Sequence, residues 1–246
     1  MQRALTNLRT SLQSVRDIAA DIDANAGVAL RQPDVMARYH TVLCAVTVIL
    51  SGFLESFIRE VAEEMILEMC SRAVPFANLP ATIRTTHYME GGRWLQKVAK
   101  AEKHEDPVTH AKAADGVRRL ASVVSGTAPY EIVWEAFTDT QANPGPSEIS
   151  AFLKRFDVDE PLPTLAREVN TTQNTLSLRL RSFIEIRNEC AHTGSSRNIP
   201  TTTDVQGYCD LLDQLGDGVV KVFVSRLGRP PYPQPPSTSV TGNVTP

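Results

Sequence analysis

Apolar side chains recur three or four residues apart over much of the chain, which is the spacing of an amphipathic helix. The first series consists of Leu5, Leu8, Leu12, Val15, Ala19 and Ile22. It predicts a helix over residues 3–25, ended by Asn25-Ala26-Gly27. Pro33-Asp34 is typical of a helix start, and from there the helical pattern continues without an internal proline to about Ser71. A single helix of that length would span about 60 Å, which few single domains need.

The middle of the chain, residues 73–170, differs because prolines and glycines interrupt it repeatedly. The interruptions are Pro75, Pro80, Gly91-Gly92, Pro107, Gly126, Pro129 and Asn143-Pro144-Gly145-Pro146. The alternation of polar and apolar residues that is typical of strands is absent there. We therefore predict a run of shorter helices, with Trp134 and Phe137 on the core-facing side of one of them.

Two further helices are predicted near the C-terminus. Leucine and isoleucine residues recur at helical spacing from Leu176 to Ile186. The last helix starts at Thr203-Asp204-Val205-Gln206, which fits a capping box with Thr203 as N-cap, and continues to about Leu227. We expect these two helices to pack as antiparallel neighbours across a short loop. Residues 229–246 are rich in proline, serine and threonine, cannot build a core, and are predicted to form a disordered tail.

The helix that begins near Leu176 closes with Arg187-Asn188-Glu189-Cys190-Ala191-His192, which places an arginine, an amide and an imidazole where no core needs them. Arg187 lies on the same stripe as Leu180 and Ile184, so it points where an apolar residue is expected. A second stripe is wholly polar and contains Arg181, Glu185, Asn188 and His192.

Arg187 and His192 are five residues apart, which leaves them roughly 140° apart on an unbroken helix. That angle is too large for both side chains to point straight at one small ligand. Either the helix ends or loosens near Ala191, with Gly194 as the terminating residue, or a symmetry-related copy completes the site.

An arginine followed after four residues by a histidine, with Asn188 directly after the arginine and an apolar helix before it, resembles the Arg-x4-6-His signature of the HEPN superfamily of all-helical domains. A second, looser similarity is the segment Phe53-Leu54-Glu55-Ser56-Phe57-Ile58, which looks like the acidic helix that many of these proteins pack beside the motif. The resemblance covers the beginning and the end of the chain and does not extend to residues 73–170.

The resemblance implies a metal-independent endoribonuclease that works as a homodimer, with both motifs in one cleft at the interface. RNA cleavage of this kind uses the neighbouring 2′-hydroxyl as nucleophile. The resemblance then implies His192 as general acid or base, Arg187 as phosphate clamp and Asn188 as a hydrogen-bonding group that orients them. Glu55 would be a supporting carboxylate. Many relatives are toxins or phage-defence effectors.

Each of these residues also has a purely structural interpretation. An arginine or histidine near a helix C-terminus can bind free carbonyl groups or complement the helix dipole. Glu55 can form an ordinary ion pair with Arg59 one turn later. The sequence leaves both interpretations open.

The chain of 246 residues carries a formal net charge of -3, with a pI near 6.0. This balance argues against a protein that coats RNA through an overall basic field, but not against a nuclease whose cleft gathers arginines from two chains.

Residues 93–119 are locally basic. They offer two interpretations: a solvated helix face, or a surface that guides RNA, with Trp94 or Tyr88 for base stacking. The candidate guiding residues are Arg93, Lys97, Lys100, Arg118 and Arg119.

Cysteine usage gives no indication of a metal or cofactor. Cys44, Cys70, Cys190 and Cys209 are widely spaced, without a Cys-x2-Cys pair or a histidine at zinc-site spacing. We expect reduced, packed thiols in a cytoplasmic protein, with Cys190 either a small packing residue or a redox handle inside the motif. No secretion signal opens the chain, and the apolar run from Val42 to Leu54 is too short and too polar for a membrane span.

Together these observations predict an all-α, HEPN-like helical bundle formed by residues 1–72 and 171–228. Residues 73–170 are predicted to be a helical insertion or subdomain, and residues 229–246 a tail. The predicted function is an endoribonuclease with an RNA substrate, a second copy of the chain, and an antitoxin or other regulatory protein as partners, in a toxin or antiviral role. The alternative is a non-catalytic helical module that binds a protein or a nucleotide.

Overall fold

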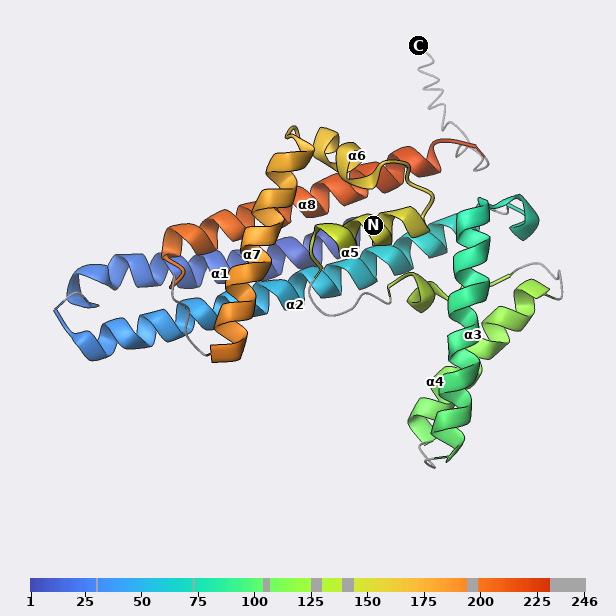
Figure 1. Ribbon diagram of the computed structural model, residues 1–246, viewed down its shortest axis with the longest axis horizontal. Helices are drawn as coiled ribbons and strands as arrows, with labels where there is room; N and C mark the ends of the chain where they lie inside the picture. The colour runs from blue at the N-terminus through green and yellow to red at the C-terminus, as the bar shows by residue number, and fades with distance from the viewer. Residues whose placement is uncertain are drawn as a thin grey trace, which may run out of the picture.

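The computed structural model describes residues 1–29, 31–72, 74–103, 107–124, 130–138, 144–193 and 199–230. Within these residues the regular structure is entirely helical, so the all-α prediction is confirmed (Figure 1). The α-helices are α1 (Gln2–Ala29), α2 (Pro33–Ser71), α3 (Ala81–Lys103), α4 (Pro107–Val124), α5 (Pro146–Arg155), α6 (Pro161–Glu168), α7 (Gln173–Thr193) and α8 (Thr202–Leu227). Two short 3-10 helices, η1 (Phe76–Asn78) and η2 (Trp134–Phe137), accompany them.

Three long helices, α1, α2 and α8, lie side by side along the long axis of the molecule (Figure 1). The predicted apolar stripe of α1 is fully buried between the other two: Leu5, Leu8, Leu12, Val15, Ala19 and Ile22. The second predicted helix is also confirmed, because α2 starts with a proline in its first turn and runs unbroken over 39 residues. Burial of these apolar faces supplies the main driving force for the fold.

The start and the neighbours of α8 differ from the prediction. The N-cap is Thr201 rather than Thr203: its side chain accepts from the backbone N–H of Asp204, whose carboxylate accepts from the backbone N–H of Thr201. The same kind of capping box therefore lies two residues earlier. α8 packs mainly on α1 and α2 and touches α7 only slightly, so the expectation that α7 and α8 form an antiparallel pair is wrong.

α7 instead crosses the three long helices at a steep angle (Figure 1). Its first half meets α6, and its main contacts are with α2. Leu176, Leu180 and Phe183 are buried, and the Phe183 ring lies 5.2 Å from the ring of Tyr208 of α8, measured between centroids. α7 thus presents one apolar side to the bundle along its length, and its C-terminal end, which carries the motif, reaches α2.

α3 and α4 pack mainly on each other and form an arm that stands off the end of the bundle (Figure 1). The helix α3 runs through Gly91-Gly92, so the predicted interruption at these glycines is wrong. His87 and Tyr130 connect the base of the arm to the rest of the molecule. The His87 Nδ1 accepts from the backbone N–H of Val133 at 3.3 Å, and the Tyr130 hydroxyl donates to the carbonyl of Val74 at 2.6 Å.

The helices within residues 73–170 differ in how they pack. α5 and α6 contribute to the same apolar core as the long helices, for instance through Phe152 and Phe156, whose rings lie 5.8 and 4.8 Å from that of Phe223 in α8. The division of the chain into a bundle and an insertion stays a prediction.

Of the tail predicted for residues 229–246, residues 231–246 lie outside the described residues. Phe137 is buried and Trp134 half-buried in η2, as expected of core residues.

One stretch of α2 is more hydrophobic than the short run Val42 to Leu54 indicates. Among the described residues, α2 is the helix that is long and apolar enough to cross a membrane, with a mean hydropathy of 2.0 over its best 18-residue window. Half of that window is buried inside the protein. The buried half belongs to the bundle core, where Leu50, Leu54 and Val61 are fully buried.

Candidate functional site

Arg187 lies on the inward side of α7, as its stripe predicts. Leu180, on the same stripe, is fully buried, and Arg187 itself is half-buried. Its Nη1 donates to the side-chain oxygen of Asn188 at 3.2 Å. Its Nε is buried and has no hydrogen-bond partner within the described part of the chain. A buried donor of this kind is costly unless a partner is supplied, and an anion is the partner that a guanidinium binds best.

His192 does not converge with Arg187 within one chain. The helix α7 ends at Thr193, directly before Gly194, which lies outside the described residues, and His192 is still part of the helix. His192 is exposed at the end of this unbroken helix. The two side chains therefore keep the divergence of roughly 140° that helical geometry gives them. A second copy of the chain is the other predicted route to a shared site.

The contact of the motif with α2 is made by Cys190. Its thiol is buried against the thiol of Cys44, and burial, with a further contribution from Cys44, raises the pKa of Cys190 to about 12. A thiol with this pKa is protonated and unreactive at neutral pH, which fits a packing residue. The contact between Cys44 and Cys190 could not be predicted from the sequence, because nothing in the spacing of the two residues indicates that α2 and α7 cross there.

Glu55 is half-buried on the side of α2 that faces α7, since eleven residues separate it from Cys44 and bring it back to nearly the same direction. It lies roughly 16 Å further along the helix than Cys44. Ser51 and Gly52, about one turn before Glu55 on α2, differ in their burial. Ser51 is fully buried with its hydroxyl unpaired within the described residues, whereas Gly52 faces open space.

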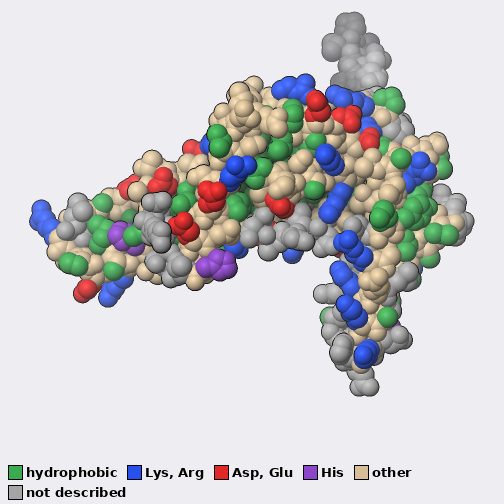
Figure 2. All heavy atoms as spheres, viewed as in Figure 1, with side chains coloured by type: hydrophobic (Ala, Val, Ile, Leu, Met, Phe, Trp, Pro, Cys, Tyr) green, Lys and Arg blue, Asp and Glu red, His purple; other side chains and the backbone are tan. Residues whose placement is uncertain are grey.

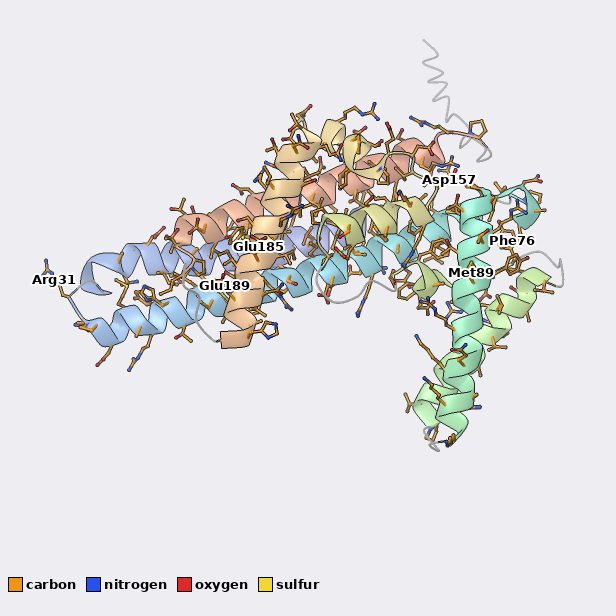
Figure 3. All side chains as sticks on the ribbon, viewed as in Figure 1. Arg31, Phe76, Met89, Asp157, Glu185 and Glu189 are labelled. Carbon is orange, nitrogen blue, oxygen red and sulfur yellow. The ribbon has the colours of Figure 1, made fainter. Side chains whose placement is uncertain are left out.

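The outward side of α7 is polar, as predicted for the second stripe. Arg181, Glu185 and His192 are exposed and Asn188 is half-buried. Figure 3 shows Glu185, just before the motif, and Glu189, within it, on α7. The exposed imidazole therefore has acidic neighbours on its own helix.

The basic residues expected to guide RNA come from two helices, α3 and α4. Arg118 and Arg119 of α4 are engaged by carboxylates: both pair with Asp115, and they also reach Glu131 at 2.9 Å and Glu135 at 3.0 Å respectively. Their charges are thus offset locally, and their proposed role in guiding RNA is not supported. Arg93, Lys97 and Lys100 of α3 are exposed.

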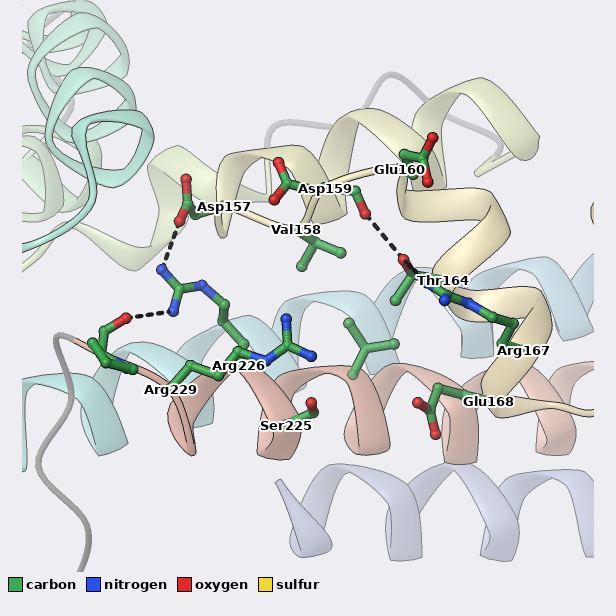
Figure 4. Close-up of a pocket in the computed structure, with 12 residues that line it drawn as sticks. Asp157, Val158, Asp159, Glu160, Thr164, Arg167, Glu168, Ser225, Arg226 and Arg229 are labelled. Atoms are coloured by element: carbon green, nitrogen blue, oxygen red, sulfur yellow. Dashed lines mark hydrogen bonds and ion pairs between the residues drawn. The ribbon is translucent and has the colours of Figure 1, made fainter.

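A separate pocket of about 480 Å³ lies between α6 and the end of α8 (Figure 4). Its lining includes acidic and basic groups that pair with each other, such as Arg226 with Asp157 at 2.6 Å. Asp157 and Glu160 adopt positive φ angles of 62° and 44° there. Because α6 meets the beginning of α7, this pocket lies away from the motif at the other end of that helix.

Within the described ranges, no three His, Cys, Asp or Glu side chains are grouped so that they could hold a metal ion.

Comparison with known proteins gives one result. The model of the family described as RiboL-PSP-HEPN matches residues 7–225, which is most of the chain and includes both the motif and the arm. No curated protein and no solved structure matches the chain.

Proposed function

The chain belongs to the RiboL-PSP-HEPN family of the HEPN superfamily, and on that premise we propose that it is a metal-independent endoribonuclease that acts as a homodimer in the cytoplasm. The observation that carries the proposal is the state of Arg187. Its guanidinium is half-buried next to Asn188, with Nε buried and unpaired among the described residues, at the end of the helix that carries the family-like motif. A structural arginine would be expected to satisfy its buried donor within the fold.

The chemistry assigns one role to each residue. The 2′-hydroxyl attacks the adjacent phosphorus, the P–O5′ bond breaks, and the products end in a cyclic 2′,3′-phosphate and a 5′-hydroxyl. His192 accepts the proton of the 2′-hydroxyl or gives one to the leaving oxygen. Arg187 binds the phosphate oxygens and stabilises the charge that develops on them, and Asn188 orients the guanidinium.

A second copy of the chain is needed because Arg187 and His192 diverge on one helix. The outer side of α2 offers a surface for it. Val42, Ile49 and Leu67 share this side and are 38, 48 and 58% exposed, and Gly52 between them leaves space for a close approach. We propose that this surface pairs with its symmetry mate, so that the arginine of one chain and the histidine of the other meet at one scissile phosphate.

The direct test is incubation of total RNA with the purified protein in the presence of a chelator. We expect the wild type to cleave RNA and to leave cyclic-phosphate ends, and Arg187→Ala and His192→Ala to lose cleavage. Intact RNA with all three proteins, each of them folded, would exclude the nuclease.

Mixing the two inactive variants tests the composite site. Random pairing makes half of the dimers mixed, and each mixed dimer contains one site with both residues intact if arginine and histidine come from different chains. We therefore expect recovery of about a quarter of the wild-type activity. No recovery, with mixed dimers shown to form, would mean that both groups act from the same chain.

The alternative function is a non-catalytic module that holds a partner protein or a nucleotide through the same bundle. It is favoured by the divergence of Arg187 and His192 within one chain and by the net charge of -3. The proposed nuclease would act as a toxin or antiviral effector. An antitoxin or another regulatory protein would restrain it. An adjacent antitoxin or defence gene in the genome would support that role.

A further inference from the structure

Tyr208 of α8 lies beside the motif although it comes from another helix. Its ring packs on the ring of Phe183, with 5.2 Å between the two centroids. Burial, the charge of Asp204 and the nearby thiol of Cys190 raise the pKa of Tyr208 to about 12. On an ideal helix Phe183, Arg187 and Cys190 lie within about 60° of one another, with Arg187 between the other two along the axis. Tyr208 therefore lies alongside the stretch of α7 from which Arg187 projects.

The hydroxyl of Tyr208 is a hydrogen-bond donor that is available to a ligand. The side chain is half-buried, with its ring against the core. Because its pKa is about 12, the hydroxyl keeps its proton at neutral pH. It makes no hydrogen bond within the described part of the chain. The hydroxyl of Tyr130, by contrast, donates to the carbonyl of Val74 at 2.6 Å.

Arg187 supplies a second donor on the same stretch of α7. Its Nε is buried and has no hydrogen-bond partner among the described residues, and the side chain as a whole is half-buried. Figure 2 shows Asp, Glu and His side chains on the outer surface where the second half of α7 lies, whereas Arg187 is on the inner side of that helix. Two donors from two helices suit an acceptor with several oxygens and a negative charge, which is a phosphate group.

We propose that the hydroxyl of Tyr208 donates a hydrogen bond to the phosphate group that Arg187 binds, which makes Tyr208 a further substrate-binding residue. This proposal rests on the proposed function. It gives each chain a phosphate subsite of its own, built from α7 and α8, to which a second chain adds His192. Recognition by this subsite depends on the phosphate and not on the base or on the 2′-hydroxyl.

Tyr88, which the sequence suggests for base stacking, provides a matched control. It lies on the arm, where its exposed ring packs edge-on against Phe76 with 5.5 Å between centroids. Tyr88→Phe therefore removes a hydroxyl group of the same kind away from the motif. The other residue suggested for stacking, Trp94, has its side chain outside the described residues.

The test uses a short, fluorescently labelled oligodeoxynucleotide in the presence of a chelator. This probe has the phosphates of RNA but lacks the 2′-hydroxyl nucleophile, so fluorescence anisotropy measures its binding without cleavage. Tyr208→Phe keeps the ring on Phe183 and removes only the hydroxyl. We expect this variant to bind the probe about tenfold more weakly than wild type, because a hydrogen bond to a charged phosphate is lost. Tyr88→Phe should bind as the wild type does, and circular dichroism establishes that both variants fold.

Combination with Arg187→Met separates a phosphate contact from a structural role. We expect the double variant Arg187→Met with Tyr208→Phe to lose less binding than the product of the two single losses, because the two groups share one phosphate. Losses that simply multiply would overturn the shared phosphate. Equal binding by the wild type, Tyr208→Phe and Tyr88→Phe would show that Tyr208 serves packing alone.

The subsite and the nuclease fail separately. Weaker probe binding in Tyr208→Phe, with no cleavage of RNA by the wild type, leaves the subsite and removes the nuclease. Cleavage by the wild type, with unchanged binding and cleavage in Tyr208→Phe, leaves the nuclease and removes Tyr208 from the site. A wild type that does not bind the probe overturns the subsite, whether or not RNA is cleaved.

Discussion

Arg187 occupies a position on α7 where the fold itself has no use for a charge. Its neighbours on the same side of the helix, Leu180 and Ile184, are buried and half-buried. The spacing of the motif helix predicts this inward direction correctly. The unpaired Nε could not be predicted, because it depends on which groups α2 places opposite the guanidinium.

Replacement of Arg187 by methionine should separate stability from activity. Methionine keeps much of the volume and removes the buried, unpaired N–H, so we expect the free energy of unfolding to stay the same or to rise by up to about 2 kcal/mol. RNA cleavage should be lost. Urea unfolding measures the free energy of unfolding. Leu180→Ala is the control for packing loss, at about 2–5 kcal/mol. A loss of stability in Arg187→Met would instead indicate that the arginine stabilises the fold.

His87 makes stability depend on pH. It is fully buried at the base of the arm, and burial lowers the pKa of His87 to about 4. The unfolded chain takes up a proton at this residue below about pH 6.5, whereas the folded chain does not until about pH 4. The contribution of the neutral imidazole is therefore complete above pH 6.5 and is lost as the pH falls toward 4, by up to roughly 3 kcal/mol.

The measurement is urea unfolding at pH 7 and pH 5 of the wild type and of His87→Leu. We expect the leucine variant to lose less stability than the wild type between these two pH values, although it also loses the hydrogen bond from Val133. His110→Leu removes another imidazole from the arm and serves as the control. An unchanged pH dependence in His87→Leu would show that the buried histidine is not the responsible group.

At the scale of the helices, glycines determine how closely α8 approaches its neighbours. A Cβ on Gly216 would lie 2.7 Å from Leu8 Cδ2 of α1, and one on Gly218 would lie 2.5 Å from Val169 Cγ1 and 2.9 Å from Leu165 Cδ1 beside α6. Real Cβ atoms do not approach so closely. These two positions therefore fix the packing of α8 on α1 and α6.

Gly218→Ala should destabilise the protein by about 1–3 kcal/mol, since overpacking outweighs the better helix propensity of alanine. Gly207 lies on the same helix, is exposed, and has open space around its Cα. Gly207→Ala should therefore stabilise the protein by about 1 kcal/mol. Thermal unfolding of the two variants provides the comparison, and a shift of the same sign in both would refute the close approach at Gly218.

The helices could be predicted to the extent that local signals determine them. Pro33 and the uninterrupted apolar pattern fix α2, but two overlapping capping boxes compete at the start of α8, and the one with the aspartate at N3 prevails. Gly91-Gly92 costs helix stability, yet α3 continues because it packs along α4. The crossing of α7 over α2 rather than α8 depends on long-range packing that spacing does not encode.

At the scale of the whole molecule, the site is predictable only in part. One helix carries Arg187, Asn188 and His192, and the sequence shows this directly. In the proposed dimeric site, whether the arginine and the histidine meet depends on how two chains associate, which a single chain does not specify. The position of the arm relative to the motif likewise follows from the full length of α2 and could not be read from the residues of the arm.

Dimer formation should depend on the outer side of α2. Ile49→Glu places a charge among exposed apolar residues, and we expect it to convert a dimer of twice the 27.0 kDa chain mass into a monomer and to abolish cleavage of RNA. Light scattering gives the mass. Val224→Glu, which charges an exposed apolar residue of α8, should leave the dimer intact. A wild-type monomer that cleaves RNA would contradict the composite site.

The unbroken α2 also has a consequence for long ligands. A 39-residue helix without an internal break sets the interval between the motif near one of its ends and the base of the arm near the other. Any ligand that touches both places must span that interval, whatever its sequence.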